Sequence, residues 1–137
     1  MAHEIAFSTH KKEELVDITS DVEKIVKSSG VNEGLCVVFA LHATAGIIIN
    51  ENADPNVCTD FLKALDKAVP SKAGYLHDKI DGNAAAHIKS AIAGPSQTII
   101  IKNCALQLGR WQSIMFCEFD GPRPARKVAV EIIKKVI

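Results

Sequence analysis

The sequence has few aromatic residues and no excess of either charge. Aromatic residues make up 5% of its 137 residues, and Lys plus Arg equals Asp plus Glu at 16 each. A nucleic-acid-binding protein normally carries a clear excess of basic residues, so we expect no nucleic-acid partner. The near-zero net charge also favours self-association, because copies of the chain do not repel one another strongly.

Zinc-type cysteine motifs and long hydrophobic runs are also missing. No two of the four cysteines have the C-x2-C spacing of many zinc and redox sites, and their apolar neighbours predict buried thiols in a reducing compartment. The longest unbroken apolar run, residues 35–41, is far shorter than the ~20 residues of a membrane-spanning helix. The first residues, MAHEIAFSTHKKEE, lack the apolar core of a signal peptide. We therefore expect a cytoplasmic protein with no membrane partner.

The length and composition predict one folded domain over residues 1–137. Hydrophobic residues make up 47% of the chain and charged residues 23%, as in ordinary globular proteins. Short segments with alternating or β-branched apolar residues predict strands. The predicted strands cover residues 3–9, 13–19, 34–42, 44–52, 97–103, 110–121 and 125–137.

Three helices are predicted between these strands: one after Ser20, one over residues 55–69 and one over residues 83–93. Ser20 and Glu23 match the capping box that opens many helices. Asp54 and Pro55 have the pattern of an N-cap followed by proline at the first helical position. The fold class is therefore α+β: one mixed, largely antiparallel sheet of about seven strands, with two or three helices packed on it.

Three of the five histidines are candidate metal ligands. His42, His77 and His87 lie in or beside predicted elements, with acidic residues in the neighbouring segments. Neutral imidazole is a common ligand of transition metals, and three imidazoles would suit zinc with one open position. The alternative is that each is an ordinary structural histidine, since the spacing along the chain does not bring the three together.

Polar residues that follow the apolar strand 44–52 form a second candidate site. Glu51 and Asn52 come just before a helix start, where backbone N–H groups favour anions such as a phosphate. They are equally compatible with a simple turn. Asp54 is explained by its predicted capping role alone.

The segments 109–112 and 118–126 offer aromatic and basic groups. Trp111, between Arg110 and Gln112, could stack on a planar ring or pack in the core. Arg123 and Arg126 could bind phosphate through paired N–H groups. Alternatively, these arginines pair with Glu118 and Asp120 on the surface.

Four sequence blocks resemble the signature blocks of a known family. They are HATAGIIINENADPNV, YLHD, DGNAAAHIKSAIAG and LQLGRWQSIMFCEFDGPRPAR. In this order and spacing they are similar to the YjbQ-like family, also described as the secondary thiamine-phosphate synthase family. The resemblance implies a compact α+β domain, assembly as a homotrimer, and a weak thiamine-phosphate synthase activity. That reaction joins a hydroxymethylpyrimidine diphosphate to a thiazole phosphate and releases pyrophosphate.

The resemblance also implies functional residues and, with the residue chemistry, three hypotheses. The first is a transferase that uses a divalent metal ion, zinc or magnesium, and basic side chains to neutralise the pyrophosphate. The second is a metal-dependent hydrolase with Glu51 or Glu118 as general base. The third is a non-catalytic trimeric protein that binds a small phosphorylated molecule. The expected catalytic residues are His42, Glu51, His77, His87 and Glu118, with the three histidines as metal ligands. The expected substrate-binding residues are Asn52, Asp54, Arg110, Trp111, Gln112 and Arg123.

Overall fold

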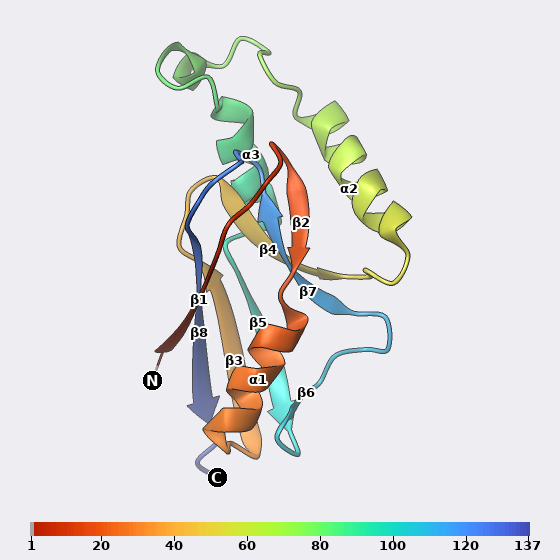
Figure 1. Cartoon of the computed structure of the whole chain (residues 1–137), viewed down its shortest axis with the longest axis vertical. Coiled ribbons are helices and arrows are strands. Elements are labelled where there is room, and N and C mark those ends of the chain that lie inside the picture. The colour runs from red at the N-terminus through yellow and green to blue at the C-terminus, as the bar shows by residue number, and fades with distance from the viewer. Residues whose placement is uncertain (1) are drawn as a thin grey trace.

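The strands form two sheets with antiparallel pairing (Figure 1). In the computed structural model, which describes residues 2–137, one sheet has the order β1-β8-β3-β5-β6 and the other β2-β7-β4. The strands are β1 (Ala2–Phe7), β2 (Glu14–Asp17), β3 (Glu33–Ala40), β4 (Ala45–Asn50), β5 (Ser96–Lys102), β6 (Ala105–Leu106), β7 (Ser113–Glu118) and β8 (Arg126–Lys134). The predicted α+β class and antiparallel pairing are confirmed. The strands divide between two sheets rather than one, because two facing sheets bury an apolar face of each.

Three helices pack on the sheets: α1 (Thr19–Ser29), α2 (Pro55–Ala68) and α3 (Ala84–Ala93), with a short 3-10 helix, η1 (Leu76–Lys79), before α3. In Figure 1, α1 lies in front of the five-stranded sheet, and α2 lies beside the three-stranded sheet. None of the residues of α2 is fully buried, so this helix is the least tightly held of the three. Among the described residues 2–137, no helix has the length and apolar character needed to span a membrane.

The main core lies between the two sheets and under α1. Val22 and Val26 of α1 share this core with Val38 of β3, Val130 of β8 and Phe116 of β7, and each of these side chains is at most 1% exposed. Successive residues of a strand point to opposite faces, so β7 also carries Cys117 into a second, smaller cluster shared with α2 and α3. As the middle strand of its sheet, β7 is therefore buried on both faces.

A glycine allows α3 to pack closely on β4. A Cβ added at Gly46 would lie 2.9 Å from the carbonyl oxygen of Gly94, closer than normal packing permits. The Ile47 N–H donates to that same carbonyl at 3.0 Å, and the Ser90 hydroxyl donates to the Ala45 carbonyl at 2.6 Å. These contacts fix the position of α3 and therefore of His87, which α3 carries.

The helix starts differ in part from the sequence-based expectations. The capping box predicted at Ser20 is wrong, because α1 begins at Thr19, so that Ser20 lies inside the helix, and the Thr19 N–H donates to the Asp17 carboxylate at 2.9 Å. The cap of α2 is confirmed, since the Asn56 N–H donates to Asp54 Oδ1 at 2.9 Å and Pro55 opens the helix. The sequence did not predict η1 or the two-residue strand β6, which are too short for a periodic pattern.

Replacing Asp54 by alanine should lower the free energy of unfolding by about 1 kcal/mol, because one N–H of α2 loses its cap. Urea denaturation followed by far-ultraviolet circular dichroism measures the change. The control is Asp60→Ala, an exposed aspartate inside the same helix, which should change stability by less than about 0.5 kcal/mol. Equal losses in the two variants would contradict the capping role.

Candidate functional site

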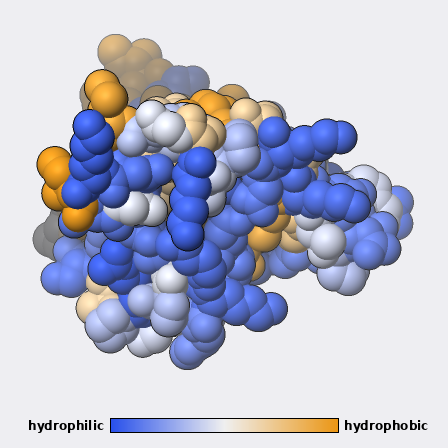
Figure 2. Space-filling model, turned by 90° about the horizontal axis from the view of Figure 1, so that it is seen from above, coloured by the Kyte–Doolittle hydropathy of each residue, from blue (hydrophilic) through white to orange (hydrophobic). Residues whose placement is uncertain are grey.

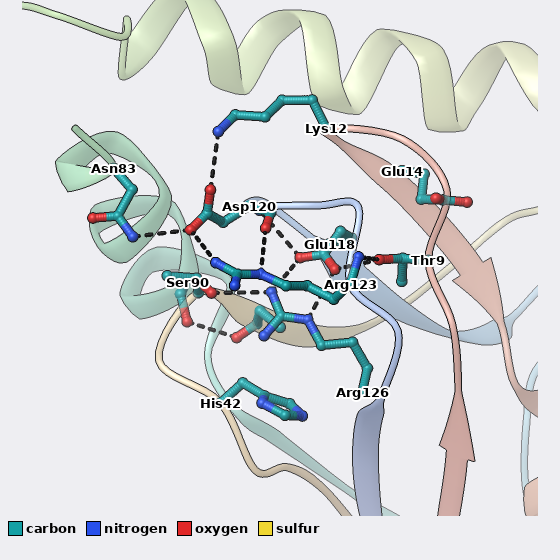
Figure 3. Close-up of polar contacts among 12 residues, drawn as sticks. Thr9, Lys12, Glu14, His42, Asn83, Ser90, Glu118, Asp120, Arg123 and Arg126 are labelled. Atoms are coloured by element: carbon teal, nitrogen blue, oxygen red, sulfur yellow. Dashed lines mark hydrogen bonds and ion pairs between the residues drawn. The ribbon is translucent and has the colours of Figure 1, made fainter. Parts of the chain in front are cut away.

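The centre of the candidate site is a buried ion pair between Glu118 and Arg126 (Figure 3). Glu118 ends β7 and is 0% exposed, while Arg126 begins β8 and is 5% exposed. Arg126 Nε donates to Glu118 Oε1 at 2.8 Å, and Nη2 donates to Oε2 and, at 3.0 Å, to the Thr44 hydroxyl. The Thr9 hydroxyl and the Asp120 N–H also donate to the carboxylate, at 2.6 and 3.1 Å.

These hydrogen bonds decide the charge of Glu118. Burial by itself raises the pKa of a carboxyl group, because it disfavours the charged form. Here the hydrogen bonds from Arg126 and Thr9 outweigh burial and hold the pKa of Glu118 below its ordinary value. The carboxylate is therefore ionised at neutral pH, and its four accepted hydrogen bonds compensate for the lost water.

A second carboxylate, Asp120, extends this cluster toward α3. It accepts hydrogen bonds from Lys12 Nζ at 2.9 Å, Asn83 Nδ2 at 2.9 Å and Arg123 Nη2 at 2.8 Å. Although burial acts in the opposite direction, the hydrogen bonds from Asn83 and Lys12 lower the pKa of Asp120 to about 2. We call the whole group the polar network: Thr9, Lys12, Thr44, Asn83, Glu118, Asp120, Arg123 and Arg126.

Gly121 allows the connection between β7 and β8 to approach the segment that carries Thr9 and Lys12. A Cβ at this position would lie 2.1 Å from the Lys11 carbonyl oxygen, so a larger residue would force the two segments apart. The Gly121 N–H donates to the Lys12 carbonyl at 2.9 Å. This close approach brings Arg123 and Thr9 together, with the Arg123 N–H donating to the Thr9 hydroxyl at 2.9 Å.

His42 lies beside Arg126 (Figure 3) and is held in one tautomer. Its Nε2 accepts a hydrogen bond from the Lys127 N–H at 2.8 Å, so in the neutral ring the proton is on Nδ1. Partial burial and then the positive charge of Arg126 lower the pKa of His42. The imidazole is therefore neutral at physiological pH, and it presents an N–H donor at Nδ1.

His77 and His87 form a separate pair. Their rings meet edge to face with centroids 4.7 Å apart. His77 Nε2 is buried, has no hydrogen-bond partner among the described residues, and lies 3.8 Å from Asp81 Oδ2. Asp78, between the two histidines in sequence, is occupied in capping α3, since it accepts from the Ala84 N–H at 2.9 Å.

The predicted three-histidine metal centre does not form within one chain. Among residues 2–137, no three His, Cys, Asp or Glu side chains are grouped so that they could hold a metal ion. His42 Nε2 already accepts a hydrogen bond from a backbone N–H. Of the three histidines, only His77 and His87 have their rings in contact. The side chains of one chain therefore do not fit the zinc or magnesium ion expected from the sequence.

The remaining predicted residues lie at the other end of β7. In the pairing with β4, Glu118 is opposite Ala45 and Ser113 is opposite Asn50. A six-residue strand spans about 17 Å, so Trp111 cannot touch the same small molecule as Glu118 within one chain. At the far end Arg110 stacks over Trp111, with 5.2 Å from its Cζ to the ring centroid.

Several side chains at this far end have structural partners. Asn52 Nδ2 donates to Asp17 Oδ2 at 2.9 Å, and Gln112 Oε1 accepts from the Gly109 N–H at 2.7 Å. Glu51 is half-buried next to them, with its N–H donating to Asn50 Oδ1 at 2.8 Å. These contacts hold the loops that precede α2 and β7.

A pocket of about 270 Å³ adjoins the polar network at the start of α3. Lys12 and Asn83 of the network line it, together with Lys89, which is only 2% exposed. Lys89 Nζ donates to Glu13 Oε2 at 2.7 Å and to Asp66 Oδ1. Figure 2 looks down on the molecule from above and shows a mainly hydrophilic surface, with hydrophobic residues mostly toward its edges.

Comparison with known proteins places the chain in a family. A family model described as UPF0047 protein YjbQ-like matches residues 3–135. The chain belongs to this YjbQ-like family. It is 47% identical to the UPF0047 protein MJ1081 of Methanocaldococcus jannaschii over 97% of this chain and 94% of that one. It is 45% identical to the UPF0047 protein YugU of Bacillus subtilis over 90% and 92% of the two chains.

Solved structures of YjbQ-like proteins share the fold. A YjbQ/UPF0047 protein from Clostridium acetobutylicum superimposes with a TM-score of 0.92 at 52% identity, covering 96% of this chain and 99% of that one. The YbjQ-like protein from Sulfolobus solfataricus P2 gives a TM-score of 0.95 at 36% identity, covering 98% and 97%. The resemblance found from the four sequence blocks is thus confirmed.

Sequence reasoning found only part of this candidate site. It proposed His42, Glu118 and Arg123, which the fold gathers at one end of β7. It considered a pairing of the arginines with Glu118 and Asp120, which is confirmed, but the Glu118–Arg126 pair is buried rather than on the surface. It gave no role to Thr9, Lys12 or Thr44, because isolated threonines and lysines carry no pattern.

The polar network should make the stability of the chain depend on pH in acid. Because the pKa of Asp120 falls from 3.8 to about 2 on folding, its stabilising effect is complete above about pH 4 and is lost toward pH 2. This contribution of Asp120 to the free energy of unfolding is about 2 kcal/mol. Between pH 5 and pH 2, the free energy of unfolding should therefore fall by about 2 kcal/mol less in Asp120→Asn than in the unchanged chain.

Urea denaturation at a series of pH values measures this difference. The control is Asp60→Asn on the exposed side of α2, which should keep the pH profile of the unchanged chain. Glu118 leaves some acid sensitivity in both variants, because its pKa is also lowered. Identical profiles for Asp120→Asn and Asp60→Asn would show that Asp120 is not held ionised by its partners.

Proposed function

We propose that this YjbQ-like protein binds a phosphorylated small molecule at the polar network and is a transferase with weak thiamine-phosphate synthase activity. The observation that carries the proposal is the charge balance of the network beside a neutral His42. Lys12, Arg123 and Arg126 supply three positive charges, against two negative charges from Glu118 and Asp120. The excess positive charge and the Nδ1–H of His42 favour an anion there.

The proposed reaction makes particular demands on the site. The thiazole nitrogen forms a C–N bond to the pyrimidine methylene carbon, the C–O bond to the diphosphate breaks, and pyrophosphate leaves with the bonding electrons. No protein nucleophile takes part, so the main contribution of the protein is to stabilise the negative charge of the leaving group. We assign no step to a metal ion, because residues 2–137 of one chain provide no group of three His, Cys, Asp or Glu side chains at this site.

Arg123 is suited to hold the leaving pyrophosphate. Its side chain is 48% exposed, and Asp120 accepts from only two of its five N–H groups. Asp120 fixes the guanidinium plane and leaves its other N–H groups available for phosphate oxygens. His42 would donate from Nδ1 to the same anion.

Glu118 acts in this proposal as a positioning residue. Its oxygens already accept four hydrogen bonds, and its pKa is lowered, so it is a poor general base. It holds Arg126 beside His42, where partial burial and then the positive charge of Arg126 lower the pKa of the imidazole. Glu51 lies at the far end of β4 and has no part in this mechanism within one chain.

Purified protein supplied with the two substrates should form thiamine phosphate, measured by chromatography after oxidation to a fluorescent thiochrome. His42→Gln and Arg123→Gln should each lower kcat/KM by about tenfold or more, since each removes a donor to the developing charge. A chain that forms no thiamine phosphate would disprove the transferase, and the non-catalytic binding function would then take its place.

Two matched variants control for side-chain type. His10→Gln removes an exposed histidine outside the network, and Arg110→Gln removes an arginine at the opposite end of β7. Both should keep at least half of the original kcat/KM. If Arg110→Gln loses as much activity as Arg123→Gln, the substrate instead lies at the Trp111 end, or both ends contribute across two chains.

We also propose that the chain assembles as a homotrimer through the outer face of the five-stranded sheet. Leu35, Ile100 and Ile133 are neighbours on this face, because Leu35 is opposite both of the others in the strand pairing. They are 40%, 61% and 49% exposed, and they line a shallow pocket of about 500 Å³. Exposed apolar clusters of this kind mark contacts between proteins, and zero net charge does not oppose them.

Light scattering coupled to size-exclusion chromatography should give the mass of three chains for the unchanged protein and a lower mass for Ile100→Lys. The lysine places a charge in the proposed contact, while its outward position spares the core. The control is Leu76→Lys on η1, an 82% exposed leucine away from the sheet, which should remain trimeric. A monomeric unchanged protein would refute the assembly, as would a trimer that only Leu76→Lys dissociates.

A further inference from the structure

We propose that Cys58, Met115 and Cys117 form a binding site for a soft monovalent metal ion, Cu(I), between α2 and β7. We call these three residues the sulfur site. It is separate from the polar network and does not depend on the proposed transferase activity. Its three ligands are two thiols and one thioether, which is a typical ligand set for Cu(I).

The strand geometry places Met115 and Cys117 on one face of β7, and Cys58 contacts Met115 on that face. Met115 and Cys117 are two residues apart on β7, so their side chains point to the same face of the three-stranded sheet. That face is covered by α2, where Cys58 lies one turn before Phe61 and Leu62. Burial, and then the nearby Cys58 thiol, raise the pKa of Cys117 to about 12.

The distance between two of the sulfurs matches shared coordination. Cys58 Sγ and Met115 Sδ are 3.6 Å apart. Two sulfur ligands about 2.3 Å from one ion, at the 120° angle of a three-coordinate site, lie about 4 Å from each other. An ion could therefore bind between these two atoms with only a small movement of either side chain.

The surroundings favour a soft ion and give it a way in. Cys117 is 0% exposed and Met115 is 1% exposed, and their neighbours include the apolar side chains of Phe61 and Leu62, so the site is dry. Cys58 is only half-buried, and its Sγ lies 3.3 Å from Asn52 Oδ1 at the edge of this layer. A hard cation such as magnesium would find too few oxygen ligands here, which selects for Cu(I).

Binding replaces protons by metal. Each thiol that coordinates Cu(I) forms an S–Cu bond and releases its proton to solvent, while Met115 coordinates as a neutral thioether and no electron transfer occurs. Because each thiol must lose its proton on binding, the apparent affinity should increase with rising pH. Two protons should be released for each ion that both cysteines bind.

Reduced, purified protein titrated anaerobically with Cu(I), in competition with a chromophoric Cu(I) chelator, tests the proposal. We expect one tightly held ion per chain and an ultraviolet thiolate-to-copper charge-transfer band. Cys58→Ser and Met115→Leu should each lower the affinity by more than about tenfold. These two variants carry the test because Cys58 is half-buried and leucine closely matches methionine in volume, so both should fold.

The other cysteines provide matched controls. Cys104→Ser removes an exposed thiol, and Cys36→Ala removes a buried thiol of the main core. Both should retain one ion per chain with unchanged affinity. The proposal is overturned if the unchanged protein binds no Cu(I), if Cys104→Ser or Cys36→Ala abolishes binding, or if Cys58→Ser and Met115→Leu bind as the unchanged protein does.

Discussion

The ion pair between Glu118 and Arg126 joins the two sheets, because Glu118 ends β7 of one sheet and Arg126 begins β8 of the other. Two charges at 0% and 5% exposure are tolerated only when their hydrogen bonds replace those of water. Thr9 and Thr44, which follow β1 and precede β4, complete those hydrogen bonds. Removing either charge would leave the other buried and unpaired, at a cost of about 3–5 kcal/mol.

This constraint also organises the candidate site. Because Arg126 is held by Glu118, its positive charge adds to partial burial in lowering the pKa of His42. Because the connection after Glu118 must return directly to β8, it brings Asp120 and Arg123 to the same end of the molecule. The polar network therefore combines a rigid, fully bonded centre with an exposed guanidinium and an N–H donor at its edge. A rigid centre of this kind suits binding of an anion in one orientation.

The sulfur site lies on the face of β7 opposite the main core. Within one strand, Phe116 packs in the main core, while Cys117 packs against α2 and Met115 contacts Cys58 of α2. Since α2 has no fully buried residue, the smaller core between α2 and β7 is more accessible to solvent than the main core. The two faces of this one strand thus support two chemically different candidate sites.

Much of the architecture could be predicted from sequence, since alternation, Asp54–Pro55 and the alanine-rich run predict elements locally. The capping box predicted at Ser20 does not form. Instead the Asp17 carboxylate, one residue before the helix cap, accepts a hydrogen bond from the Thr19 N–H. The candidate site was harder to predict from the sequence, because its residues come from segments that are far apart along the chain. His42 was found by residue type, whereas Thr9 and Lys12 depend on an approach that Gly121 alone permits. Trp111 and Glu118 were grouped together although β7 separates them.

The sequence by itself determined the α+β class, the family, and which residue types could do chemistry, because periodicity and motif are local properties of the chain. Only the tertiary structure decided that the strands form two sheets, that the arginine and glutamate pair is buried, and that one chain does not unite its three histidines. The physical reason is that contacts between distant segments depend on how apolar faces pack against one another. Spacing along the chain does not encode that packing.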